Sequence, residues 1–498
     1  AMDALSGKIR SKMGEALRSV AASEALSDVT TKSLEALRKF TYVAHREPRG
    51  AIEGPRAVQV MSEAVALDTT FAEAYRYLSI LVSNYGGSIQ LGTEAAIQAH
   101  RFRDRLSPRK QLLVEGHYHT TVTGDYQQAA RAFRGLVELD SLDGTATTNL
   151  ADILMYAGDY DEAERMLLST PRPELNVWSW NLVAALSGQK EYAEAEAALE
   201  EATTAQPDNI YMPIGRGLFF ATQGRLEEAL AELDFPAPTP DAVRAWGAYV
   251  SATALAQGGR LNQARDQLEE ANEILWRYGT PPELIRNTAA MAFISGWMEG
   301  DVEAGAADLE RLLANMVLDD LGPVDRSLGG LSLIYAVIGV PEKAQAFVAR
   351  YQAEVPSQGD PFGRSQMAVA EAISQISRGV SHEEAGLLTA TDLMRCSRCR
   401  QFYAGHGFEL AGETDRAIAF FEKASVTHMT PEFPRTFNAL VTGELSFLRG
   451  NMAGVRAARD EAASMPGLSM RDSLFFESLG VLLESEGKTY RQVFDEAM

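Results

Sequence analysis

The feature that most constrains the fold is a short pattern that recurs along the chain. In each copy a turn residue, usually glycine, stands five positions before an alanine. The five clearest copies are Gly124–Ala129, Gly158–Ala163, Lys190–Ala195, Gly224–Ala229 and Gly259–Ala264. Their alanines are 34, 32, 34 and 35 residues apart. A regular period of this length predicts an array of repeats, in which each unit packs on its neighbours.

Other positions in the same frame predict that each unit is a helical hairpin. A small residue, such as Ala151 or Gly217, stands twelve positions before the alanine, and a large apolar residue, such as Phe133 or Leu199, stands four positions after it. Small residues let two helices approach closely, and the apolar residue fills the space toward the next hairpin. The glycine can close the first helix in a left-handed cap. The sequence therefore predicts an all-α fold.

The spacing and these positions resemble the tetratricopeptide repeat (TPR), a helix–turn–helix unit of about 34 residues. Looser copies, such as Gly339 with Ala344 and Gly412 with Ala417, extend the resemblance over residues 33–498. The resemblance implies a right-handed α-solenoid, the TPR superhelix, of about 12–13 hairpins.

We expect three parts along the chain. They are an N-terminal helix or linker over residues 1–32, an N-terminal TPR array over 33–275 and a more degenerate TPR array over 276–498. The last boundary is placed where the spacing lengthens to 41 residues between Gly259 and Gly300, and to 39 between Gly300 and Gly339.

Three phrases near the N-terminus carry a second resemblance: Leu26–Leu37, Ala64–Tyr75 and Leu106–Lys110. They are similar to the TPR region that follows the catalytic and membrane-spanning parts of bacterial receptor-like Ser/Thr protein kinases. This resemblance implies a regulatory region of a longer protein, lying outside the cytoplasm. A stand-alone array would be cytoplasmic. No kinase residues are present, so no catalytic residue is carried over.

The charge of the chain limits its partners. It has 46 Lys and Arg against 68 Asp and Glu, which gives a net charge of −22 over 498 residues. We therefore expect no nucleic-acid partner, since those proteins usually present a basic face. A neutral or basic protein partner is favoured instead. We also expect no membrane span, because no apolar run approaches the length of about 18 residues that a span needs.

The sequence contains few candidates for catalytic, redox or metal-binding residues. Cys396 and Cys399 would share one face of a helix, and packed thiols, a labile disulfide and a metal site completed from elsewhere all remain open. His117 and His119 would face different sides, and His382 lacks a second histidine four residues later. We predict no catalytic residue, no cofactor and no metal site.

The first helices of such an array line its concave face, and aromatic side chains with a polar end suit binding surfaces. The predicted partner-binding residues are Tyr118, Asp152, Met155, Trp180, Tyr211, Trp246, Tyr249, Phe402, His406 and Glu409. For Trp180 and Trp246, packing between repeats is the alternative. The sequence thus favours a non-catalytic scaffold or sensor module that binds a protein or peptide. An oligomerisation module and an enzyme with an unrecognised site are the alternatives, and the oligomeric state stays open.

Overall fold

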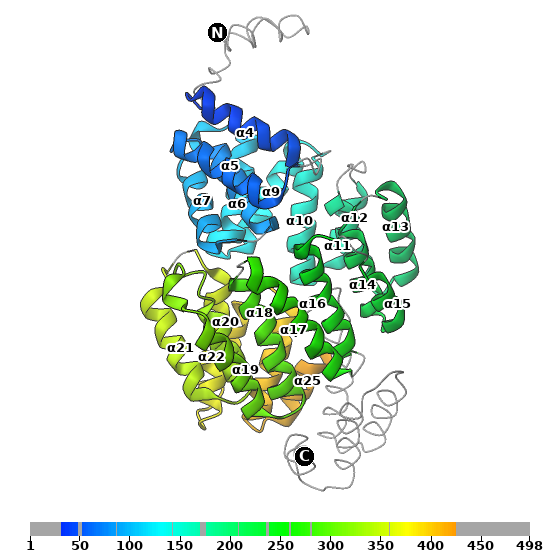
Figure 1. The fold of residues 1–498 in the computed structure, drawn as a ribbon, viewed down its shortest axis with the longest axis vertical. Coiled ribbons are helices and arrows are strands. Elements are labelled where there is room, and N and C mark those ends of the chain that lie inside the picture. Colours follow the sequence, from blue (N-terminus) through cyan, green and yellow to red (C-terminus); the bar gives the residue numbers. More distant parts are fainter. Residues whose placement is uncertain are drawn as a thin grey trace, which may run out of the picture. The chain divides into compact units, whose positions relative to one another are not determined.

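The computed structural model describes residues 31–47, 52–85, 87–141, 143–169, 176–207, 209–235, 239–257, 260–278, 281–357 and 359–424. Twenty-two α-helices and no strand occur in these residues. The helices follow one another as antiparallel pairs (Figure 1), so the predicted all-α repeat fold is confirmed. Most of the predicted N-terminal segment 1–32 and the last predicted hairpins lie outside the described residues.

The chain forms two compact units. Unit 1 comprises residues 1–146 together with 356–361, and unit 2 comprises residues 147–355 and 362–498. These units follow contacts between helices rather than the lengths of the repeats. The division at residue 275 therefore stays a prediction.

In its described residues, unit 1 consists of three hairpins and the first turn of a fourth helix pair. Its helices are α4 (Leu34–Arg46), α5 (Gly54–Leu67), α6 (Ala72–Tyr85), α7 (Ile89–Arg101), α8 (Pro108–Tyr118), α9 (Tyr126–Leu139) and the start of α10 (Gly144–Ala157). A π-helical turn, η3 (His119–Thr123), follows α8. Side-chain oxygens begin several helices: those of Ser33, Ser88 and Asp125 each accept a backbone N–H three residues on. Such caps satisfy donors that have no partner within the helix.

Unit 2 continues the series of hairpins. Its helices are the rest of α10, α11 (Tyr160–Ser169), α12 (Asn176–Gly188), α13 (Tyr192–Ala205), α14 (Met212–Thr222), α15 (Leu226–Glu232), α16 (Asp241–Gln257), α17 (Leu261–Tyr278), α18 (Pro281–Phe293), α19 (Val302–Asn315), α20 (Leu328–Val337), α21 (Pro341–Glu354), α22 (Pro361–Ile376), α23 (Leu387–Asp392), α24 (Ser397–Leu410) and α25 (Thr414–Ala424). No helix in the described part of the chain is both long and apolar enough to cross a bilayer.

The residues of the repeat frame occupy the positions that the pattern predicts. All five frame alanines are fully buried, and the large apolar residues that follow them lie in the core. The turn before the alanine takes a left-handed conformation, with φ of +70° at Gly124 and +66° at Lys190. Lys190 therefore adopts the conformation for which glycine is preferred elsewhere in the frame.

The longer spacings after residue 259 also have a structural cause. α17 has 18 residues, and a π-helical turn, η4 (Ile294–Met298), extends α18. A further short helix, η5 (Leu318–Asp320), lies in the connection between α19 and α20. Each addition lengthens one helical hairpin and leaves the order of alternating helices unchanged.

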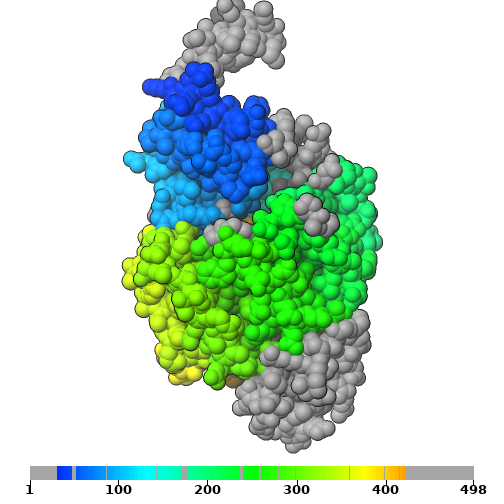
Figure 2. All heavy atoms as spheres, viewed as in Figure 1, coloured from blue at the N-terminus to red at the C-terminus, as the bar shows by residue number. Residues whose placement is uncertain are grey.

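The late helices of unit 2 fold back onto much earlier ones. Phe402 of α24 lies 6.5 Å from Phe293 and 5.6 Å from Trp297, between ring centroids, although two hairpins separate these helices in sequence. One continuous apolar core runs from Ala245 to Phe421 as a result. Side chains fill the spaces that the ribbons leave open (Figure 2).

Candidate functional site

Four predicted partner-binding residues, Trp180, Tyr211, Trp246 and Tyr249, lie on consecutive hairpins of unit 2. We call this group the aromatic stripe. Trp180 belongs to α12, Tyr211 caps the N-terminus of α14, and the other two belong to α16. Tyr211 is 38% and Trp246 45% exposed, and their ring centroids are 6.0 Å apart. Two large aromatic side chains thus form a single exposed contact surface across neighbouring hairpins.

Trp180 joins this surface through a glycine. A Cβ atom built on Gly215 would lie only 1.7 Å from the indole of Trp180, so the indole occupies the space that a larger residue would need. Gly215 follows Tyr211 by four residues, so both lie on the same face of α14. Trp180 is half-buried. It packs between hairpins, as the alternative interpretation held, and still keeps part of its surface exposed.

Tyr249 extends the stripe toward α18. The guanidinium of Arg286 lies 4.6 Å from the centre of the Tyr249 ring, a cation–π arrangement. Partial burial raises the pKa of the Tyr211 phenol. The Tyr211 hydroxyl therefore stays protonated at neutral pH and can donate a hydrogen bond. The stripe offers apolar area, hydroxyl groups and one flanking positive charge.

Of the two predicted residues of α10, Met155 is buried, whereas the side chain of Asp152 is 45% exposed but already paired. Met155 is 7% exposed. Asp152 forms an ion pair with Arg395, and the Arg395 guanidinium also lies 3.4 Å from the centre of the Tyr156 ring. The chain therefore already supplies a cationic partner to this predicted binding residue.

Of the three predicted residues of α24, Phe402 and His406 lie in the interior. Phe402 is 1% exposed and His406 is fully buried. Glu409 is half-buried and lies 3.3 Å from Nδ1 of His406. The expectation that Phe402 and His406 line an open face does not agree with this burial. The physical reason is the aromatic core around Phe293 and Trp297, which takes up the inner face of α24.

Tyr118 lies in unit 1, within a polar cluster formed by α7, α8 and η3. Its ring stacks on His100 at 3.9 Å between centroids, and Glu115 lies 3.1 Å from His100 and 2.6 Å from Arg103. His117 faces away from this cluster and contacts Ser79 at 2.8 Å. Burial lowers the pKa of His117 to about 4, so its imidazole is neutral at neutral pH.

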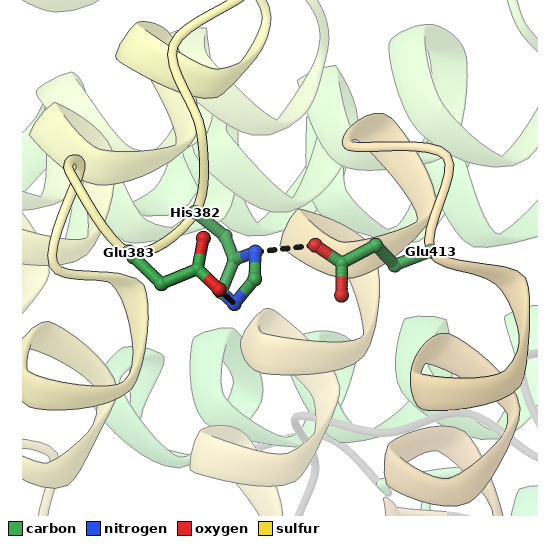
Figure 3. Close-up of side chains that lie close together, drawn as sticks. All are labelled: His382, Glu383 and Glu413. Carbon is green, nitrogen blue, oxygen red and sulfur yellow. Dashed lines mark ion pairs between the residues drawn. The ribbon is translucent and has the colours of Figure 1, made fainter.

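A compact group of ionisable side chains surrounds His382 in unit 2 (Figure 3). Glu383 lies 2.8 Å from Nε2, and Glu413 contacts Nδ1 on the opposite side of the ring. Arg416 also reaches this group and pairs with Glu413 at 3.0 Å. The candidate ligand atoms of His382, Glu383 and Glu413 lie within 4.8 Å of one another, but the guanidinium of Arg416 also contacts Nε2 of His382. A cation at this place would lie beside the positive charge of Arg416, so the arrangement fits a group of ion pairs around His382 better than a metal centre.

Comparisons with known proteins agree with the repeat frame. Residues 123–186 and 182–234 match two family models, both described as tetratricopeptide repeat. Residues 123–234 are thus similar to TPRs. They contain most of the aromatic stripe's supporting helices, from α11 to α15. No curated protein matches the chain.

One similar solved structure is described as "Structure of Naa15/Naa10 bound to HypK-THB". It is 15% identical, with a TM-score of 0.24, and the match covers 90% of this chain. The chain spans 66% of that structure's matched chain. At this TM-score the likeness supports no argument about function.

The sequence did not predict the contacts of Arg286 with Tyr249 or of Arg395 with Tyr156. Arg286 and Tyr249 belong to adjacent hairpins, but position 286 is not one that the frame marks, and Arg395 lies 239 residues from Tyr156. A frame of 34 residues reports which residues of adjacent hairpins are equivalent. It contains no signal for a contact that skips several hairpins.

Proposed function

We propose that this chain is a non-catalytic scaffold that binds a protein or peptide through the aromatic stripe. The observation that carries the proposal is the exposed contact between Tyr211 and Trp246, at 6.0 Å between ring centroids. Aromatic residues with a polar end are enriched at protein interfaces, where a few of them supply most of the binding energy. The TPR similarity of residues 123–234 supports the same class of function.

The chemistry of the stripe and of the whole chain favours a neutral or basic partner. The net charge of −22 attracts basic segments over distances of about a Debye length. The ring faces of Trp246 and Tyr211 can in addition accept cationic side chains. An extended peptide that presents apolar and basic residues would match both features.

A finer proposal concerns the protein to which this region belongs. The phrases Leu26–Leu37, Ala64–Tyr75 and Leu106–Lys110 support a role as the regulatory region of a Ser/Thr protein kinase. The test is to read the coding sequence upstream of Asp3. A kinase domain followed by an apolar segment of about 20 residues would agree with it, and a different upstream domain would contradict it.

The binding proposal is tested with peptides selected from a random phage-displayed library on the whole chain. The dissociation constant of the best peptide is then measured for the natural sequence, Tyr211→Ala and Trp246→Ala. We expect each substitution to weaken binding at least about tenfold, because truncating a central aromatic anchor commonly costs about 2 kcal/mol or more.

Trp276→Ala is the matched control. Trp276 is 47% exposed, but it lies on α17, the second helix of its hairpin. We expect the dissociation constant of the peptide to change less than about twofold in this variant, because Trp276 lies outside the proposed contact surface. Equal losses of peptide affinity in Tyr211→Ala, Trp246→Ala and Trp276→Ala would contradict the proposal. A change of molecular mass in light scattering, for Trp246→Ala alone, would instead indicate that the stripe joins copies of the chain.

A further inference from the structure

The two cysteines of the chain lie at the start of α24. Cys396 is the N-cap of this helix, and its sulfur accepts the backbone N–H of Cys399 at 3.0 Å. Their Cα atoms are 5.1 Å apart and the sulfurs are joined as a disulfide. Disulfides need a Cα separation of about 4.4–6.8 Å. The helix therefore holds both residues in a geometry that permits the bond.

The N-terminus of α24 stabilises negative charge on the sulfur of Cys396, and the flanking arginines add positive charge nearby in sequence, although the Arg395 guanidinium itself pairs with Asp152. The N-terminus of a helix carries a partial positive charge, which favours an anion at the N-cap. Arg395 directly precedes Cys396, and Arg400 directly follows Cys399. Cationic neighbours and a helix N-terminus are the conditions under which a cysteine becomes a reactive thiolate. These features apply to the reduced state of the pair.

The two cysteines differ in burial, although both pack on the same apolar core. Cys396 is half-buried, whereas Cys399 is only 9% exposed. Cys399 belongs to the apolar core that also contains Phe402 and Met394. An incoming thiolate therefore meets the sulfur of Cys396 first. In disulfide exchange one sulfur is attacked and the other leaves. The difference in burial makes Cys396 the attacked residue and Cys399 the leaving one.

We propose that Cys396 and Cys399 form a reversible redox pair that exchanges with low-molecular-weight thiols. The thiolate of one external thiol attacks Sγ of Cys396 and forms a mixed disulfide, while the Cys396–Cys399 bond breaks and the Cys399 sulfur leaves and takes up a proton. A second external thiolate attacks the external sulfur of the mixed disulfide, which releases the Cys396 thiolate. Two external thiols are thereby oxidised to one disulfide and lose two protons, and the protein disulfide gains two electrons. One of the protons is taken up by the Cys399 sulfur, and the other goes to solvent because Cys396 is left as a thiolate. This site is separate from the aromatic stripe and goes beyond the proposed binding function.

The position of the pair connects its redox state to a long-range contact. Arg395, adjacent to Cys396, forms the ion pair with Asp152 and lies over Tyr156. The disulfide closes a small ring that fixes the backbone next to Arg395. Reduction opens this ring, and only the contacts with Asp152 and Tyr156 then hold the guanidinium of Arg395 in place.

The first experiment follows the redox state of the whole chain. The chain is equilibrated in mixtures of reduced and oxidised glutathione, treated with N-ethylmaleimide and weighed by mass spectrometry. Because the chain has only 2 cysteines, the number of adducts reports the state directly. We expect conversion from two adducts to none as the oxidised fraction rises, and full recovery of both adducts on return to reduced glutathione. A chain that keeps two adducts in every mixture would overturn the proposal.

The second experiment measures which thiol reacts. The reduced chain is treated with limiting iodoacetamide near neutral pH, and peptide mapping identifies the modified cysteine. We expect Cys396 to react at least about tenfold faster in the folded chain than in urea, since the helix N-terminus at Cys396 is lost on unfolding. Cys399 should react more slowly in the folded chain than in urea. Equal or slower reaction of Cys396 in the folded chain would overturn the assignment.

Two variants serve as matched controls. Cys399→Ser keeps Cys396 as a single thiol, and its fast alkylation should persist. Cys396→Ser keeps only the core cysteine, and its alkylation should be slow until urea is added. Peptide mapping of the natural chain needs neither variant, so a variant that fails to fold leaves the test intact.

Discussion

At the scale of single residues, glycines set how closely the helices of unit 2 approach. Gly329 of α20 is the clearest case. A Cβ atom at this position would lie 2.2 Å from the carbonyl oxygen of Gly363 in α22, which is far inside van der Waals contact. The obstacle is backbone, which cannot rotate away as a side chain can. The crossing of these two helices therefore requires glycine at position 329.

The adjacent glycine gives a matched comparison. A Cβ atom on Gly330 would meet only the side chain of Gln366, at 3.6 Å. We expect Gly329→Ala to lower the free energy of unfolding by about 1–3 kcal/mol through overpacking. Gly330→Ala should raise it by up to about 1 kcal/mol, because alanine is the better helix former. Urea denaturation of both variants measures the difference, and a similar change in the two would contradict the crossing geometry.

At the scale of elements, a capping aspartate of unit 1 links the first turn of α10 to α8. Asp143 precedes α10, and its carboxylate accepts the backbone N–H groups of Thr145 and Ala146 at 3.1 Å. The same side chain, 3% exposed, pairs with Arg109 of α8 at 2.5 Å. One carboxylate thus caps one helix and binds the first helix of the preceding hairpin.

Two substitutions at this position separate the two roles. Asp143→Asn keeps an oxygen that can cap α10 but loses the ion pair, and we expect it to cost about 1 kcal/mol. Asp143→Ala loses the cap as well, and should cost about 2–3 kcal/mol in total. The measurement is the free energy of unfolding in urea, followed by a signal from unit 1. Equal costs would mean that the cap contributes nothing.

The sequence predicts the elements well because the repeat frame is a packing pattern. Ala163 and Ala195 are buried where the frame places them, and even Lys190 takes the turn conformation of its glycine equivalents. The frame also places Tyr211 and Trp246 on equivalent helices. It cannot predict that Phe402 is buried, because Phe293 and Trp297, which pack on it, come from α18 and η4, and two hairpins separate these from α24 in the sequence.

At the scale of the molecule, unit 2 differs from a simple linear array, in which each repeat touches only its neighbours. The ion pair between Arg395 and Asp152 joins residues 243 positions apart. The Arg395 guanidinium adds a cation–π contact with Tyr156 at 3.4 Å. The start of α24 is therefore held against α10 by two interactions of one side chain.

Removing that side chain should loosen the late helices. We expect Arg395→Ala to speed backbone hydrogen exchange in α24 and α25, and to lower the free energy of unfolding of unit 2 by about 1–2 kcal/mol. Arg378→Ala is the control, because its pair with Glu342 is exposed and spans adjacent hairpins. That pair should contribute less than about 1 kcal/mol. Unchanged exchange in α24 for Arg395→Ala would show that the aromatic core alone holds the helix.

The contact between Arg395 and Asp152 also has a mechanical consequence. Under tension applied to its two ends, an ordinary solenoid extends like a spring, since no bond spans distant coils. Unit 2 contains such a contact, and it acts together with the packing of Phe402 on Phe293 and Trp297. We therefore expect unit 2 to resist small loads more strongly than a linear array of the same length, because its distant hairpins cannot separate until both contacts are broken.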